Sequence, residues 1–326
     1  MIPLQLPQPL RVWGFKVAAS FEHITVLRHE TVSQAVGTLN EGIVVDCTLG
    51  GGGHTEYLLE NYEGIQVFGL DRDEDALAAA AKRLERFGSR FQPLHTRFSS
   101  VERALQEIGV AQVDGLLADF GVSSYQIDTA GRGFSFRFDG PLDMRMDATR
   151  DEPLSDKLET VDEATLADII YEFGEERRSR AVARVIKASM PKTTLELADL
   201  IRSVVRKSKD GIDPATRTFQ ALRIWVNSEL DEIRRLLESL PTVLRPGGHA
   251  ALISFHSLED RLVKRAFKTF AAPCECPKAL PVCQCGKVPT FEVITRKPIV
   301  ASKDEIKSNS RSRSAKLRAA RRLDAA

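Results

Sequence analysis

The sequence lacks any long hydrophobic run and any excess of one charge. None of its apolar stretches approaches the ~18 residues that a membrane-spanning helix needs. Residues 1–20 interrupt their apolar patches with Gln, Pro, Arg and Lys, which argues against a secretory signal peptide. The 46 Lys and Arg residues are balanced by 45 Asp and Glu residues, giving a formal net charge of +1. This balance excludes a uniformly basic, histone-like binder, but it allows an enzyme with a locally basic surface.

Cysteine is scarce, and its placement is uneven. The chain has 5 cysteines among 326 residues, and four of them share one segment: Cys274, Cys276, Cys283 and Cys285. A small secreted protein held by disulfides would spread its cysteines along the chain, so we expect a reducing, cytoplasmic setting. Paired Cys-x-Cys units can bind zinc tetrahedrally, although zinc motifs more often use Cys-x-x-Cys. We rank reduced thiols ahead of zinc here and predict no metal.

The pattern between residues 42 and 119 alternates short apolar strands with helices. We expect strands at 43–45, 66–70, 91–95 and 113–118, and helices at 55–61, 73–87 and 101–108. Alternation of this kind is typical of a mostly parallel, doubly wound α/β sheet with helices on both faces. A strand at 249–255 and a helix at 258–270 return later. The simplest prediction is one sheet domain interrupted by an insertion.

The interrupting segment has a helical pattern. Helices are expected at 163–173, 177–188 and 194–205, with one long helix at 214–240, and Asp162 and Thr193 are candidate N-caps. The predicted organisation is an N-terminal extension (1–21), a sheet domain (22–135 and 243–306), a helical insertion (136–242) and a basic C-terminal tail (307–326). Between Lys307 and Arg322 the tail has seven basic residues and no acidic one. It is either a solvated, partly disordered terminus or an arm that contacts RNA phosphates.

A glycine-rich turn follows the first predicted strand. That strand ends at Asp46, and four glycines follow at 50–53, before a helix. Glycine lets a ligand approach the backbone, and a helix N-terminus presents free N–H groups to an anion. A dinucleotide motif would need a third glycine where Thr55 stands. An acid before the glycines fits S-adenosylmethionine better, with Gly50 in the cofactor loop and Asp46 either ordering it or facing the cationic methionine. A purely structural turn is the alternative.

Further candidates stand where other predicted strands end. Asp71 follows the second strand, where a ribose diol needs an acceptor, although it could instead cap a helix, a role that Asp73 can also fill. Phe98 could flank an adenine ring or belong to the core. Asp119 follows the fourth strand beside the expected cofactor crevice and is the catalytic candidate. Gln126 lies in the polar loop after it.

Two other enzyme classes are disfavoured by missing partners. The Asp-Phe-Gly triplet at 119–121 matches a kinase metal-binding motif, but neither an H-R-D catalytic loop nor a kinase glycine-rich loop accompanies it. Ser and His occur together at 255–257, but no G-x-S-x-G elbow is present, which disfavours a hydrolase triad.

Several long stretches together resemble one family, the ribosomal RNA small subunit methyltransferase H or MraW-like cytosine-N4 methyltransferases. The resemblance extends from about Phe21 to Arg322. The matching stretches are HITVLRHETV (23–32), DCTLGGGGHT (46–55), GLDRD (69–73), LLADFGVSS (116–124), RGFSFRFDGPLDMRMD (132–147), DPATRTFQALRIWVNSEL (213–230), LRPGGHAALISFHSLEDRLVK (244–264) and SRSAKLR (312–318).

The resemblance implies a class I (Rossmann-like) methyltransferase sheet with a helical insertion that recognises substrate. It implies methylation of N4 on a cytosine in the decoding region (P site) of 16S ribosomal RNA. The implied S-adenosylmethionine contacts are Gly52, Gly53, His54, Asp71, Phe98, Asp119 and Gln126. Tyr125 stands where a proline is expected, which puts the reach of Gln126 in doubt, and the first twenty residues have no counterpart.

Cytosine N4 is a poor nucleophile because its lone pair is delocalised into the ring. We therefore expect Asp119 to accept a hydrogen bond from N4, and the base to be unpaired or flipped. No metal is required, since the leaving group is a neutral thioether. The competing hypotheses are a non-catalytic ribosome-assembly factor with the same fold and, more weakly, an NAD-linked oxidoreductase.

The expected partner is 16S rRNA, within the small subunit or a precursor of it; the oligomeric state stays open, a homodimer included. Two basic groups could contact this RNA. Arg132, Arg137 and Arg145 either hold phosphates or form ion pairs with Asp139, Asp143 and Asp147. The helix with Arg177, Arg178, Arg180, Arg184 and Lys187 is by default a solvated face.

Overall fold

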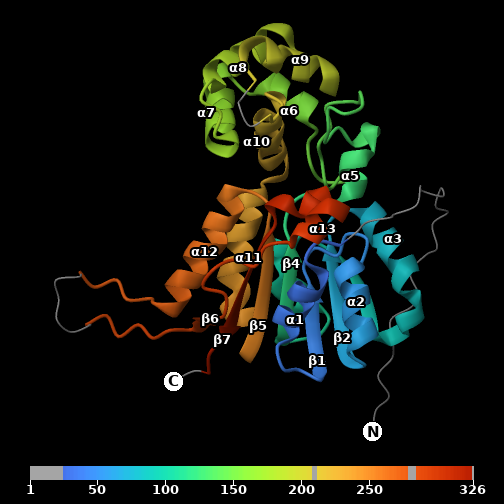
Figure 1. Cartoon of the computed structure of the whole chain (residues 1–326), viewed down its shortest axis with the longest axis vertical. Coiled ribbons are helices and arrows are strands. Elements are labelled where there is room, and N and C mark those ends of the chain that lie inside the picture. Colours follow the sequence, from blue (N-terminus) through green and yellow to red (C-terminus); the bar gives the residue numbers. More distant parts are fainter. Residues whose placement is uncertain (1–24, 208–210, 278–283, 325–326) are drawn as a thin grey trace.

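The computed structural model describes residues 25–207, 211–277 and 284–324, so the expected extension at 1–21 lies outside the described residues. A seven-stranded sheet in the order β3-β2-β1-β4-β5-β7-β6 forms the centre of the molecule (Figure 1). Strands β1 to β5 pair in parallel, and β7 pairs antiparallel with β5 and β6, which confirms the predicted mostly parallel α/β sheet. The strands are β1 (Glu41–Asp46), β2 (Gly64–Asp71), β3 (Phe91–His95), β4 (Val113–Asp119), β5 (Leu244–Ser254), β6 (Phe291–Val293) and β7 (Lys316–Arg322).

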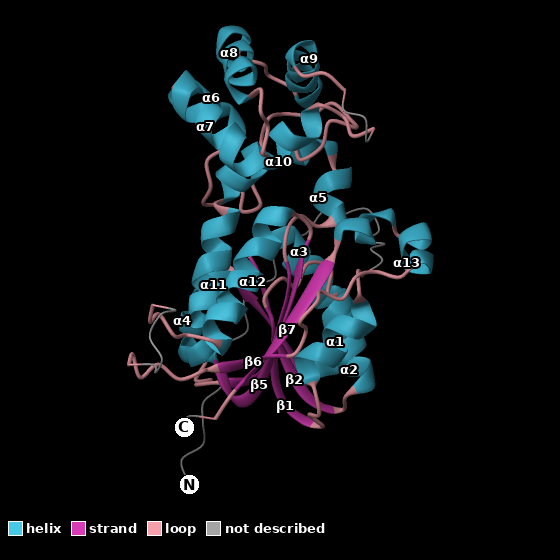
Figure 2. Cartoon of the chain, turned by 60° about the vertical axis from the view of Figure 1, so that its left-hand side comes forward, coloured by secondary structure: helices cyan, strands magenta, loops and turns pink. Residues whose placement is uncertain are grey.

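Helices cover both faces of this sheet (Figure 2). One face packs against α1 and α2 through Val32 and Leu58, and the other against α4, α11 and α12 through Leu105, Leu236 and Phe267. The expected strands and helices between residues 42 and 119 are present, with ends shifted by a few residues. The helices of this domain are α1 (Arg28–Val36), α2 (Gly53–Asn61), α3 (Glu74–Leu84), α4 (Val101–Glu107), α11 (Glu229–Val243), α12 (Ser257–Ala271) and α13 (Lys303–Ser308).

A second, all-helical unit lies beyond one end of the sheet (Figure 1). It has its own core, in which Leu166, Ile186, Ile201 and Leu222 are fully buried. Its helices, preceded by the short α5 (Ser124–Asp128), are α6 (Leu154–Thr160), α7 (Glu163–Gly174), α8 (Ser179–Ser189), α9 (Thr194–Val204) and α10 (Ala215–Asn227). Among the described helices, none combines the length and apolar character that crossing a bilayer requires.

The predicted single helix at 214–240 is wrong. It breaks at Ser228, which adopts a left-handed conformation with φ +51° and separates α10 from α11. Helix α10 completes the helical core, whereas α11 packs on the sheet. The insertion therefore ends near residue 228 rather than 242. No glycine or proline marks the break in the sequence, and the two helices pack into different cores on either side of it.

The predicted separate tail at 307–326 is also wrong. Residues 316–322 form β7, which lies between β5 and β6, and Leu317, Ala319 and Ala320 are fully buried. Several basic side chains of this segment pair with acids of the domain. Arg318 Nε lies 2.7 Å from Asp260 Oδ1, and Arg311 pairs with Asp128 at 2.7 Å. The basic residues of this segment are interspersed with buried apolar residues, and together they form a strand that the charge pattern alone does not indicate.

Candidate functional site

The glycine-rich turn is held between two strands. The Cys47 amide donates to the Leu117 carbonyl on β4, and the Leu49 amide donates to Leu70 on β2, both at 2.9 Å. Gly52 precedes α2 with φ +79°, and a Cβ there would lie 3.0 Å from Leu84 Cδ1. Glycine at 52 is therefore required by the turn itself.

Asp46 lies beneath this turn and is completely buried. Its Oδ1 accepts from the Thr48 amide at 3.1 Å, and its Oδ2 accepts from Thr55 Oγ1 at 2.8 Å. Burial raises its pKa to about 7. Of the two predicted roles, the geometry fits the first, in which Asp46 orders the loop.

A cavity of about 340 Å³ opens where β1, β2 and β4 end. This volume lies in the range of small-molecule sites. Seven of the nine sequence-predicted site residues line it, and Asp46 and Gly52 do not. The seven are Gly50, Gly53, His54, Asp71, Phe98, Asp119 and Gln126.

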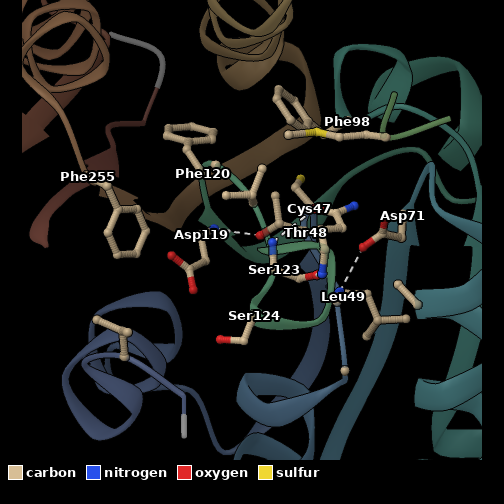
Figure 3. A pocket seen from close by; sticks show the side chains of 18 of the residues that line it. Cys47, Thr48, Leu49, Asp71, Phe98, Asp119, Phe120, Ser123, Ser124 and Phe255 are labelled. Carbon is tan, nitrogen blue, oxygen red and sulfur yellow. Dashed lines mark hydrogen bonds between the residues drawn. The ribbon is translucent and has the colours of Figure 1, made fainter. Parts of the chain in front are cut away.

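Asp71 forms one end of the cavity, and its carboxylate is held by the backbone (Figure 3). Oδ2 accepts from the Gly50 amide at 2.8 Å, and Oδ1 accepts from the Asp73 amide at 2.9 Å. Burial raises its pKa. Asp73, and not Asp71, caps α3 by accepting from the Asp75 amide at 3.1 Å. Each carboxylate oxygen keeps a further lone pair that a ligand hydroxyl can use.

Asp119 lies on the other side of the turn formed by Cys47, Thr48 and Leu49, and its side chain points toward Phe255 and Ser124 (Figure 3). Its backbone amide donates to Thr48 Oγ1 at 2.5 Å. Its Oδ1 is buried and has no hydrogen-bond partner in the part of the chain that the structure describes. Burial, followed by the negative charges of Asp46 and Glu259, raises the pKa of Asp119 well above its ordinary value.

Three more predicted residues form walls of the cavity. The Phe98 ring lines it while packing against Phe120, with centroids 5.7 Å apart, so it is both core and cavity wall. The buried Gln126 donates from Nε2 to Asp73 Oδ2 at 2.7 Å and accepts from the Ser123 amide at 3.0 Å. Its side-chain amide thus ties α5 to the start of α3. His54 Nε2 lies 3.0 Å from the Val26 carbonyl.

Sequence reasoning missed a charged cluster behind Asp119. Arg223 and Glu229 line the cavity and form a two-point ion pair at 2.7 and 2.8 Å, joining α10 to α11. The buried Glu259 accepts from the Phe255 amide at 2.7 Å, and His256 Nε2 lies 3.1 Å from its Oε1. Burial opposes the charge of Glu259, but His256 and Arg223 outweigh it and lower its pKa. Arg223 and Glu229 are six residues apart, a spacing that predicts no contact on a continuous helix, so the sequence does not indicate this pair.

The candidate phosphate-binding arginines differ in their surroundings. Arg145 pairs with Asp143 at 2.8 Å, one of the acids predicted for it. Arg132 pairs with Asp73 at 2.8 Å, which was not predicted, and donates to the Arg145 carbonyl at 3.1 Å. Arg137 is exposed. Arg132 and Arg145 therefore fix the loop beside the cavity.

Comparison with known proteins identifies the family. Residues 20–323 match the family model described as the MraW methylase family. The ribosomal RNA small subunit methyltransferase H of Sorangium cellulosum (strain So ce56) is 48% identical over 100% of this chain and 97% of its own length. The protein of that name from Geobacter sp. (strain M21) is 49% identical over 93% and 99%. Among solved structures, an rRNA methylase from Streptococcus thermophilus covers 91% of this chain and 95% of its own at 12% identity, with a TM-score of 0.36. The chain belongs to the MraW methylase family, and its cofactor is S-adenosylmethionine.

Proposed function

We propose that this methyltransferase methylates the exocyclic N4 of a cytosine in the decoding region (P site) of 16S rRNA, in the cytoplasm. The relatives' names supply the small-subunit rRNA. One observation carries the proposal for the chemistry. At the end of β4, beside the cavity, Asp119 keeps a buried carboxylate oxygen without a hydrogen-bond partner in the described chain. A buried acceptor left open in this way costs stability, which a ligand N–H would recover.

The cavity's donor and acceptor set fits the cofactor. Asp71, fixed by two backbone amides, offers acceptors to a ribose diol. Gly53 at the first turn of α2 lines the cavity, where the N–H groups of a helix start suit a carboxylate, and Phe98 offers an aromatic face to a purine. When bound, S-adenosylmethionine supplies an electrophilic methyl group on a sulfonium whose departure leaves a neutral thioether.

Asp119 would act on the cytosine amine. An N4–H that donates to the carboxylate localises the lone pair on nitrogen, which makes N4 a better nucleophile. The same hydrogen bond favours the ionised carboxylate and opposes the burial that raises the pKa of Asp119. Once the N4–methyl bond forms, N4 carries one proton too many, and the carboxylate is placed to accept it.

The helical unit would present the RNA. In the loop whose Phe138 carbonyl accepts from Thr194 Oγ1 of α9, Arg137 and Phe138 are exposed, and Phe138 is 58% accessible. At the start of α8, Arg177, Arg178 and Arg180 are exposed, whereas Lys187 donates to the Leu158 carbonyl at 2.7 Å. Exposed guanidinium groups and an aromatic ring suit single-stranded RNA, which binds through phosphates and base stacking.

The test is mass spectrometry of rRNA from a strain that lacks this gene. N4-methylated cytidine should disappear from one 16S position, return with the wild-type gene, and stay absent when Asp119→Ala is supplied at equal protein level. Unchanged N4-methylcytidine in the deletion strain would overturn the proposal. If Asp119→Ala restored the modification in full, the catalytic role of this residue would be refuted.

A further inference from the structure

An arm between α12 and β6 projects from the sheet domain (Figure 1). Its base is closed by two contacts. The Phe270 and Phe291 rings stack with centroids 5.0 Å apart, and the Thr290 amide donates to the Phe270 carbonyl at 2.9 Å. In its described parts, residues 272–277 and 284–290, no residue is buried. The arm therefore has no hydrophobic core there that could hold its two sides together.

Three cysteines nevertheless converge on this arm. The sulfur atoms of Cys274, Cys276 and Cys285 all lie within 4.8 Å of one another. The Gln284 amide donates to Cys276 Sγ at 3.3 Å, and Lys287 Nζ lies 2.6 Å from Glu275 Oε1. After Cys285 the chain turns at Gly286, with φ +64°. Both sides of the arm thus contribute sulfur.

We propose that Cys274, Cys276 and Cys285 bind a structural zinc ion. Tetrahedral zinc with Zn–S bonds of about 2.3 Å places its sulfurs roughly 3.8 Å apart, so only small movements are needed. Thiolates are soft ligands that select zinc, and an amide N–H directed at a sulfur stabilises its charge. The proposal reverses the ranking drawn from sequence, because Cys-x-Cys spacing understates a site assembled from both sides of an arm. Cys283 lies outside the described residues, and three described sulfurs carry the argument.

The metal would hold the two sides of the arm together, which a hydrophobic core does in larger units. A zinc ion that bridges Cys274 and Cys276 to Cys285 would cross-link the arm beyond its aromatic base, and its binding free energy would become local folding free energy. A disulfide would join only two of the three sulfurs. This inference does not depend on the proposed RNA substrate.

The first test is the metal content of the full-length chain, purified without a tag under reducing conditions and analysed by mass spectrometry. We expect about one zinc ion per chain, as for a single tetrahedral site. Cys285→Ser should lose most of it. The matched control Cys47→Ser, whose thiol is buried at the glycine-rich turn, should keep it. A wild-type chain without zinc, or with a disulfide between any two of the three cysteines, would overturn the proposal, as would zinc retained by Cys285→Ser.

A second measurement uses only the wild-type chain, so the proposal can be tested even if Cys285→Ser fails to fold. Zinc is stripped from the wild-type chain with a chelator, and trypsin cleavage after Lys287 is followed over time. Cleavage there should accelerate several-fold on stripping and return to its original rate when zinc is restored. An unchanged rate in the stripped chain would contradict the cross-link.

Discussion

Each end of the cavity has an aspartate carboxylate, but the two carboxylates differ in their hydrogen bonding. At one end, both oxygens of Asp71 accept backbone amides at 2.8 and 2.9 Å. At the other end, Asp119 Oδ1 is shielded from water but accepts nothing within the described chain. Both strands end at the same edge of the sheet, so the difference comes from the turns that follow them.

This difference suits Asp71 to binding a ligand and Asp119 to taking part in a reaction. A carboxylate pinned by two amides cannot rotate and is preorganised as a wall for a ligand. A buried carboxylate with an open oxygen and a raised pKa is poised to accept a hydrogen bond or a proton. Asp46, buried between them, is electrostatically coupled to both. Substitutions at these positions test whether the two ends differ in function.

The largest effect is expected from Asp119→Asn. Asparagine keeps an acceptor but cannot take a proton, so kcat for RNA methylation should fall by roughly 10²- to 10⁴-fold. The Kd for cofactor, measured by calorimetry, should change only a few-fold. Asp114→Asn is the matched control on the same strand, since Asp114 pairs with Arg245 away from the cavity. Full turnover by Asp119→Asn would contradict the assignment of Asp119 as the catalytic residue.

Asp71→Asn should mainly weaken cofactor binding. A hydrogen bond to a charged acceptor contributes roughly 1.5–3 kcal/mol, so the Kd should rise about 10- to 100-fold. At saturating cofactor, kcat should fall far less than in Asp119→Asn. Calorimetry together with saturation kinetics separates the two quantities. A variant with normal affinity and a collapsed kcat would erase the contrast between the ends.

Asp46→Asn should change how stability depends on pH. The pKa of Asp46 is about 7 in the folded chain and about 3.9 when unfolded. Between pH 4 and 7 the unfolded chain releases this proton while the folded chain keeps it, so the free energy of unfolding falls as pH rises. The loss is at most about 1.4 kcal/mol per pH unit, and it ends above pH 7.

Asparagine removes this titration, and the decline should become shallower. It should not vanish, because Asp71 and Asp119 also have raised pKa values. Urea unfolding at pH 5, 6, 7 and 8 measures the slope. Equal slopes in both proteins would show that Asp46 titrates normally.

The smallest effect is a shift in the pH profile of kcat. Because Asp119 must be ionised to accept a proton, kcat should rise with pH. Glu259→Gln removes a negative charge that raises the pKa of Asp119, so the rise should move to lower pH. The surface variant Glu292→Gln, which removes a pair with Arg321, is the control and should leave the profile unchanged. A shift in the opposite direction would contradict the proposed coupling.

Sequence reasoning succeeded where the signals are local. The alternation of strands and helices, the glycine-rich turn and the acids at strand ends are all short-range patterns, and parallel strands bring their ends together. It failed where tertiary packing decides. Nothing in the sequence marks the left-handed Ser228, and the Arg223–Glu229 pair closes across that break.

The C-terminal strand is a second case in which tertiary packing overrides a local sequence pattern. A run of basic residues indicates a solvated tail, but backbone pairing with β5 and β6 makes residues 316–322 a strand, and Arg318 of this strand pairs with Asp260. The Cys-x-Cys spacing of the arm indicates nothing of how its two sides face each other. The fold brings the sulfur of Cys285 next to those of Cys274 and Cys276.

The position of β7 has a consequence for biosynthesis. It comes last in the chain among the seven described strands of the sheet, yet it is inserted between β5 and β6. Until residues 316–322 leave the ribosome, β5 has an open edge at which Leu252 and Ile253 lack their partners Arg318 and Leu317. Unpaired edges of this kind recruit other chains. A nascent chain that stalls shortly before this strand is therefore prone to aggregation through the open edge of β5.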